Sequence, residues 1–219
     1  MTLAAPPIIL PIFSTPFGVL RIQDAEQINV AVQHVFAERR RRDSSAQAAF
    51  HYRSADDLLD WPDACVHQLT DEIVGGMHAF VTSICELTEA QLRTLKLEAR
   101  AWFSVIGTNG LLPATSYPLT AWCAVYCVGT PAPTPRGDSG LLRLYESRLG
   151  NMLQDATNAA MRIPFKTGHY AWRPVAGELA IFPASMLHEI SLVRAAGELT
   201  LVTLRARFIA PGQQGFGRW

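Results

Sequence analysis

Hydrophobic positions in the first part of the chain recur with the period of an α-helix. After Asp24, one apolar stripe has the spacing i, i+4, i+7 and i+8: Ile28, Val32, Val35 and Phe36. After Pro62, which suits a first helical turn, a second stripe follows: Leu69, Ile73, Met77, Phe80 and Ile84. We therefore predict two amphipathic helices, the first ending near Asp43, and Gly75-Gly76 would let another segment approach the second closely.

From Leu95 onward the period changes from helical to two. Residues 95–105 alternate between apolar and polar side chains, which is typical of a half-buried strand. In the next strand, Leu119–Val128, the residues Trp122, Ala124 and Tyr126 share one face, opposite Cys123, Val125 and Cys127. We predict five further strands, at Leu141–Tyr145, His169–Arg173, Glu178–Phe182, Glu189–Val193 and Leu199–Phe208. We predict loop or irregular structure over residues 44–60 and 150–166, and extended chain over residues 8–22.

Helices that precede many short strands indicate an α+β fold. We expect a β-sandwich or jelly roll with the helices packed on one outer face, in a single domain over residues 1–219. An open jelly roll has exposed sheet edges through which two copies can pair, so a homodimer is one possible assembly.

Charge and composition narrow the classes of partner. The chain has 19 basic and 19 acidic residues, so it has no general attraction to nucleic acid or to anionic membranes. We interpret the basic run Arg39–Arg42 as a solvated helix end, where it favours the negative end of the helix dipole. No stretch predicts a membrane span, and the N-terminal residues lack the basic region of a signal peptide.

The four cysteines form no C-x-x-C pair. Cys123 and Cys127 fall on one face of a predicted strand, where small buried thiols pack well. We expect a cytoplasmic protein without disulfides, acting on a small molecule.

The stretch from Pro174 to Ile190 holds the clearest candidate chemistry. A turn ending in Gly177 precedes the apolar run 179–182, Pro183 ends that run, and His188 follows before Ile190. A histidine just after such a corner can be held rigidly and still face a cavity, as a metal ligand or an acid–base group must.

This pattern, P-x-x-G-x-L-x-x-F-P-x-x-x-x-H, resembles the distal-histidine strand pair of the iron(II)- and 2-oxoglutarate-dependent oxygenases, in particular a small bacterial group with an FPSWLxH-type motif. Other segments resemble the same family: 11–22, Phe50–Ser54, Trp102–Val105, Ser139–Leu141 and Glu146–Arg148. The resemblance implies a double-stranded β-helix, the cupin-like jelly roll of this superfamily. It also implies an iron(II) held by H-x-H or H-x-D plus the distal histidine, and an arginine that clamps 2-oxoglutarate.

The sequence departs from the family at those ligands. Where the group has H-x-H-P, this chain has Thr115-Ser116-Tyr117-Pro118, and no His, Asp or Glu lies between Arg100 and Asp138. A neutral hydroxyl is a weak iron(II) ligand, and a phenol must first lose a proton. The usual clamp position is apolar, although Arg205 follows on the face of Leu199 and Leu201. We expect no metal and no cofactor; if any metal binds, His188 is its ligand.

Three functions remain open. In the first, a metal-free enzyme uses His188 as acid or base, Tyr117 as donor and Thr115 to position a substrate. The cavity for its small-molecule substrate would be lined by Trp102, Trp122, Tyr126 and Trp172, and Arg148 and Arg205 would bind an anionic substrate. In the second, the protein binds without catalysis. In the third, atypical ligands hold iron(II) with 2-oxoglutarate in a genuine hydroxylase.

Overall fold

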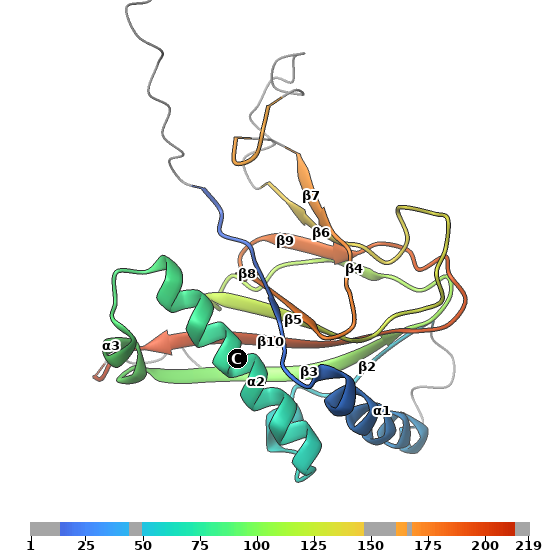
Figure 1. Cartoon of the computed structure of the whole chain (residues 1–219), viewed down its shortest axis with the longest axis horizontal. Helices are drawn as coiled ribbons and strands as arrows, with labels where there is room; N and C mark the ends of the chain where they lie inside the picture. Colours follow the sequence, from blue (N-terminus) through green and yellow to red (C-terminus); the bar gives the residue numbers. More distant parts are fainter. Residues whose placement is uncertain (1–13, 44–49, 147–160, 166–167, 213–219) are drawn as a thin grey trace, which may run out of the picture.

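The computed structural model describes residues 14–43, 50–146, 161–165 and 168–212, which form two antiparallel sheets and a layer of helices (Figure 1). The larger sheet has the strand order β1 (Gly18–Arg21), β8 (Glu178–Pro183), β5 (Trp122–Gly129), β10 (Leu199–Ile209), β3 (Lys96–Ile106) and β2 (His51–Arg53). The smaller sheet has the order β4 (Leu112–Thr115), β9 (Leu187–Ile190), β6 (Leu142–Tyr145) and β7 (His169–Trp172). The α+β jelly roll predicted from the sequence is confirmed.

The helices cover the outer face of the larger sheet (Figure 1). They are α1 (Ala25–Arg42), α2 (Ala64–Ile84), the short α3 (Glu89–Arg93) and the 3-10 turn η2 (Leu58–Asp60). Both predicted stripes face this core, since Val32 and Phe36 of α1 and Ile73 and Met77 of α2 are buried in it. Phe36 stacks on Phe103 of β3 with ring centroids 4.2 Å apart, so the apolar stripe of α1 packs directly against the sheet.

Two glycines lie where elements approach closely, Gly76 in the predicted Gly75-Gly76 pair and Gly177 in the predicted turn. A Cβ on Gly76 would lie 2.9 Å from Leu179 Cδ2, so α2 packs against β8 where that helix has no side chain. Gly177 has φ +87°, and a Cβ there would lie 2.8 Å from the Cβ of Ala25. The turn that leads into β8 therefore requires glycine.

A second core fills the space between the two sheets. It includes Cys123 and Cys127 of β5 together with Leu142, Phe182 and Ile190, all buried. Because side chains alternate along a strand, one face of β5 packs on the helices and the other faces the smaller sheet. The four cysteines are free thiols, and Cys123 and Cys127 do lie on one face, as predicted.

Several elements differ from the prediction. Strand β2 lies within the segment predicted to be a loop, and β4 lies between the predicted strands 95–105 and Leu119–Val128, where no strand was predicted. Neither shows hydrophobic alternation, because β2 has only three residues and β4 is an edge strand that contains Pro113. Strand β9 begins at Leu187, two residues earlier than predicted, so His188 lies within the strand. The predicted irregular segment 150–166 falls mostly outside the described residues.

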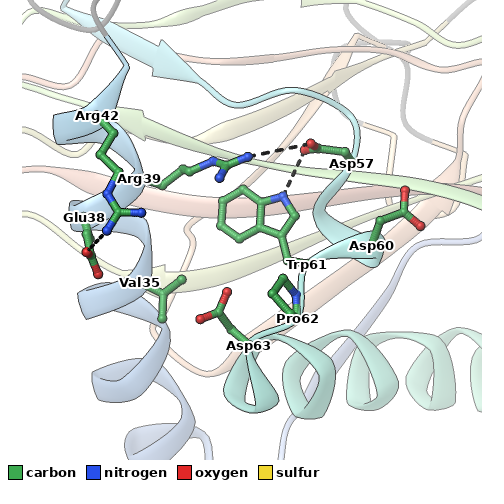
Figure 2. A pocket seen from close by; sticks show the side chains of 9 residues that line it. All are labelled: Val35, Glu38, Arg39, Arg42, Asp57, Asp60, Trp61, Pro62 and Asp63. Atoms are coloured by element: carbon green, nitrogen blue, oxygen red, sulfur yellow. Dashed lines mark hydrogen bonds and ion pairs between the residues drawn. The ribbon is translucent and has the colours of Figure 1, made fainter.

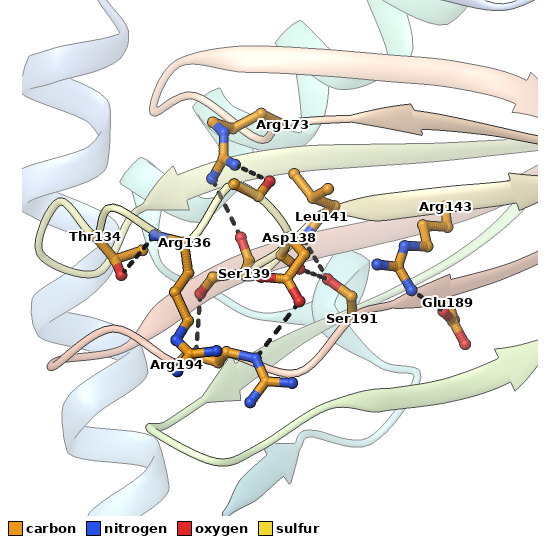
Figure 3. A network of polar contacts seen from close by, with 11 residues as sticks. Thr134, Arg136, Asp138, Ser139, Leu141, Arg143, Arg173, Glu189, Ser191 and Arg194 are labelled. Carbon is orange, nitrogen blue, oxygen red and sulfur yellow. Dashed lines mark hydrogen bonds and ion pairs between the residues drawn. The ribbon is translucent and has the colours of Figure 1, made fainter.

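A polar network supports the loop that leads into β6 (Figure 3). The Arg173 guanidinium donates to the carbonyls of Gly137 and Ser139, at 2.6 and 3.2 Å. Ser191 Oγ donates to the Asp138 carbonyl at 2.7 Å and accepts from the Leu141 amide at 2.9 Å. These bonds satisfy backbone groups that no strand partner reaches, and they fix the approach to the smaller sheet.

The basic run at the end of α1 is paired with acidic groups. Arg40 contacts Glu198 at 2.6 Å and Arg42 pairs with Glu38, while Arg39 lies 4.7 Å above the Trp61 ring and 4.0 Å from Asp57. A surface hollow of about 400 Å³ lies beside these side chains (Figure 2). Its rim includes Asp60 and Asp63 as well, so charges of both signs surround it. Among the described residues, no helix is long and apolar enough to cross a membrane.

Candidate functional site

A cavity of about 310 Å³ lies between the two sheets. Its walls are mostly apolar, with a few polar side chains from strands β2, β3, β4, β9 and β10, which is the usual character of a small-molecule site. The lining residues that carry the argument below are His51, Arg53, Trp102, Ser104, Thr115, Tyr117, His188 and Thr203.

His188 stands on the wall formed by the smaller sheet. In β9 it is paired with Thr115 of β4 and with Leu144 of β6, and its side chain is 6% exposed. Its Nδ1 lies 2.8 Å from the Met186 carbonyl oxygen. A carbonyl only accepts, so Nδ1 carries the proton and the neutral imidazole has its lone pair on Nε2. Burial lowers the pKa of His188, and the bond to Met186 opposes this shift.

Tyr117 lies directly beside His188. Their ring centroids are 5.6 Å apart, and the Tyr117 ring meets Trp102 edge to face at 5.7 Å. The Tyr117 amide donates to the Ala184 carbonyl at 2.7 Å, which fastens the turn after β4 to the turn after β8. Burial raises the pKa of Tyr117 to about 12, so the phenol is neutral and can donate a hydrogen bond. The structure thus brings Thr115, Tyr117 and His188 together.

The opposite wall comes from the larger sheet. Trp102 and Ser104 on β3 face the cavity beside Thr203 and Leu201 on β10, because these residues are paired across the two strands. Arg53 on β2 is paired with Ser104, and its guanidinium lies 4.3 Å above the Trp102 ring. Two buried atoms on this wall have no hydrogen-bond partner, Ser104 Oγ and the Nε2 of His51.

Arg205 follows Leu201 and Thr203 on the same face of β10, beside the cavity. Its guanidinium is 5.3 Å from the Tyr117 ring and 5.7 Å from the Trp102 ring, and it donates to Asp56 at 3.2 Å. Asp56 also pairs with Arg53. Arg205 therefore contacts the aromatic pair at the edge of the cavity, and its role in binding an anionic substrate stays a prediction.

Three predicted cavity residues point elsewhere. Trp122 and Tyr126 lie on the helix-facing side of β5, where Trp122 packs on Phe80 and the Tyr126 hydroxyl donates to Asn29 at 2.7 Å. Trp172 on β7 packs on Phe17, outside the cavity lining. Aromatic residue type suggested these positions, whereas strand alternation assigns Val125 to the cavity. Arg148 lies outside the described residues.

Sequence reasoning missed five polar residues of the cavity: His51, Arg53, Ser104, Glu189 and Thr203. The alternation of residues 95–105 already separated Trp102 and Ser104 from the apolar side of the strand. His51 and Arg53 gave no such signal, because β2 is short and lies between polar residues.

The comparisons with known proteins concern the fold. No family model matches the chain, and no curated protein matches its sequence. A solved Pseudomonas putida prolyl-4-hydroxylase has a TM-score of 0.53 at 15% identity over 90% of this chain and 93% of its own. HygX from Streptomyces hygroscopicus, with nickel and 2-oxoglutarate bound, has a TM-score of 0.59 at 10% identity over 88% and 83%. A Trichoplax adhaerens prolyl hydroxylase has 0.53 at 10% over 87% and 82%.

These similarities confirm the double-stranded β-helix that Fe(II)/2-oxoglutarate oxygenases share. At such low identity they show the fold alone, so the chemistry must be argued from the residues of this chain.

The donor set does not fit the iron that this fold implies. Among the residues that the structure describes, no group of three His, Cys, Asp or Glu side chains could hold a metal ion. The two groups that accompany His188 are a neutral hydroxyl and a phenol whose pKa is raised rather than lowered. His169 does not replace them, because β6 separates β7 from β9.

The two cavity histidines predict a loss of stability in mild acid. Burial lowers the pKa of His188, and burial followed by the nearby Arg53 charge lowers that of His51. Below their ordinary pKa of 6.5, the unfolded chain binds more protons than the folded protein, so the free energy of unfolding falls as pH falls toward the folded values. Urea unfolding near pH 7.5 and 5.5 should reveal this slope, and His51→Gln and His188→Gln should each reduce it. An unchanged slope in both variants would contradict the lowered pKa values.

Proposed function

We propose that this protein is an enzyme that acts on a small molecule in the cavity between its sheets, by acid–base chemistry that does not need iron. The observation that supports the proposal best is the pairing of His188 and Tyr117 in one largely apolar cavity, with ring centroids 5.6 Å apart. A base and a neutral donor side by side can act on neighbouring atoms of one ligand.

The protonation of each group matches its proposed role. His188 has its proton fixed on Nδ1 by the Met186 carbonyl, so Nε2 accepts a proton from the substrate. Its lowered pKa keeps it neutral, and therefore basic, at neutral pH. Tyr117 donates a hydrogen bond, and then a proton where required, to a substrate oxygen. Thr115, paired with His188 across β4 and β9, positions the same end of the substrate.

This arrangement favours reactions that move protons without redox change. Removal of a proton by His188, with Tyr117 stabilising the oxygen on which charge develops, leads to isomerisation. If a hydroxyl leaves with the Tyr117 proton, the same pair carries out dehydration, and attack by an internal nucleophile gives cyclisation. A mostly apolar wall strengthens both interactions because it excludes water.

The second candidate is an Fe(II)/2-oxoglutarate oxygenase, which the fold and the nickel and 2-oxoglutarate bound in HygX favour. The presence of Thr115 and Tyr117 at the ligand positions disfavours this candidate, because neither supplies the carboxylate or imidazole that iron(II) prefers. The two candidates differ in a direct measurement of metal binding.

An anaerobic iron(II) titration with and without 2-oxoglutarate tests the choice. We expect no stoichiometric iron in the wild-type protein and no consumption of 2-oxoglutarate. The double variant Thr115→His/Tyr117→His restores the family's H-x-H, and it should bind iron(II) together with His188, which serves as the positive control for the scaffold. Stoichiometric iron and 2-oxoglutarate turnover in the wild-type protein would overturn the metal-free proposal.

A further inference from the structure

Two buried polar atoms in the cavity lack a partner within the protein. Ser104 is 1% exposed and its Oγ makes no hydrogen bond, and the buried Nε2 of His51 makes none either. A buried hydroxyl without a partner is destabilising because it has lost its hydrogen bonds to water, so such groups are retained mainly where something else satisfies them. Both atoms belong to side chains that line the same cavity, which indicates a ligand as the missing partner.

The strand register places these two groups beside one charge. Ser104 of β3 is directly paired with Arg53 of β2, and His51 is two residues along β2, on the same face as Arg53. Arg53 lies over the Trp102 ring in the cavity lining, and it shares Asp56 with the guanidinium of Arg205. Arg53 therefore has no carboxylate of its own.

Glu189, an acidic side chain of the cavity lining, has its charge engaged elsewhere. Its Oε1 accepts from the Tyr145 hydroxyl at 2.7 Å and pairs with Arg143 at 3.4 Å. Its charge is therefore occupied on the far side of the smaller sheet. Ser104 and His51 can both donate, and Arg53 adds one positive charge, so the group that fits them is an anionic acceptor.

We propose that Ser104, His51 and Arg53 form a subsite that binds a carboxylate of the substrate. Ser104 Oγ and the Nε2–H of His51 donate to the carboxylate oxygens, and Arg53 balances the charge. A carboxylate suits this subsite better than a phosphate, whose charge of about −1.5 to −2 would exceed one shared guanidinium. The carboxylate subsite rests on the proposed function in one respect only. The other end of the ligand faces Tyr117 and His188, and its reaction there belongs to that proposed function.

The test compares phenylacetate with its neutral isostere phenylacetamide, by ligand-observed NMR and calorimetry in excess EDTA. We expect phenylacetate to bind at least about tenfold more tightly than the amide, and inorganic phosphate to bind more weakly than phenylacetate. Ser104→Ala and Arg53→Gln should each weaken phenylacetate binding by about tenfold or more, since each removes a bond to a charged group. In protein with ¹⁵N-labelled histidines, phenylacetate should shift the Nε2 resonance that disappears in His51→Gln.

The chain offers a matched control. Thr120 Oγ1 is also buried without a partner, but Thr120 does not line the cavity. Thr120→Val should leave phenylacetate binding unchanged. Ser104→Ala should weaken binding while raising the melting temperature of the free protein, because it removes an unpaired hydroxyl, and this combination excludes misfolding as the cause.

The subsite and the proposed catalysis can fail separately. Equal binding of acid and amide, or unchanged binding in Ser104→Ala and Arg53→Gln, would overturn the subsite whatever His188 does. Binding of phenylacetate only after iron(II) is added would overturn it as well. His188→Gln should keep the preference for phenylacetate over phenylacetamide, because that preference comes from the carboxylate end of the ligand.

Discussion

His188→Gln is expected to abolish turnover while leaving the protein folded. Loss of a positioned general base reduces kcat by about 10²–10⁴-fold, and a glutamine amide fills similar space without a basic nitrogen. The assay incubates the protein with a small-metabolite extract in EDTA and follows new masses by mass spectrometry. Products of isomerisation, dehydration or cyclisation should appear with the wild-type protein and not with His188→Gln.

The partner variant separates the two proposed roles. Tyr117→Phe removes only the hydroxyl, and loss of one donor to a developing charge reduces kcat by about 10²–10³-fold. Because the two groups act on one step, the double variant should be little worse than the poorer single variant. His67→Gln, which changes an exposed histidine on α2, should retain full activity.

The pH profile gives an independent readout. In the free enzyme, kcat/KM should fall as pH drops through the pKa of His188, which lies below 6.5 because the residue is buried. Chelating metal ions with EDTA should not change this acid side of the kcat/KM profile. Activity that survives in His188→Gln, or that requires added iron(II), would contradict the assigned base.

The fold was predictable because its signals are repeated along the chain. Val32 and Phe36 show the period of α1 without any tertiary information, and alternation over residues 95–105 shows that β3 has two different faces. The proximity of Thr115, Tyr117 and His188 was predictable for another reason. The resemblance fixed their register, and β4 and β9 place Thr115 opposite His188.

The rest of the cavity depends on pairing that no local pattern reveals. His51 and Arg53 face the cavity only because the three-residue β2 joins the edge of the larger sheet beside β3. Trp122 and Tyr126 were chosen for their aromatic rings, although their strand positions already assigned them to one face. Which face meets the helices is decided by the docking of α1 and α2, where Tyr126 finds Asn29. Aromatic residue type therefore gave the wrong cavity residues on β5, and the direction of each side chain along the strand is the better guide.

Phe103→Ala is expected to cause the largest loss of stability in the chain. Phe103 is fully buried, stacks on Phe36 at 4.2 Å, and contacts Tyr52 and Trp61 at 5.4 and 5.9 Å between ring centroids. Removing such a ring costs about 3–5 kcal/mol, from lost burial and from the cavity left behind. Chemical denaturation should show a lower free energy of unfolding.

This prediction tests how the helices are held on the sheet that forms the site. Phe103 points to the helices while its neighbours Trp102 and Ser104 point to the cavity, so one strand supports both cores. Phe50→Ala provides the control, since Phe50 is 69% exposed and its loss should change stability by less than about 0.5 kcal/mol. A loss below about 1 kcal/mol for Phe103→Ala would mean that α1 does not dock over β3. The wall that carries Trp102 and Ser104 would then lack the support that keeps the cavity in shape.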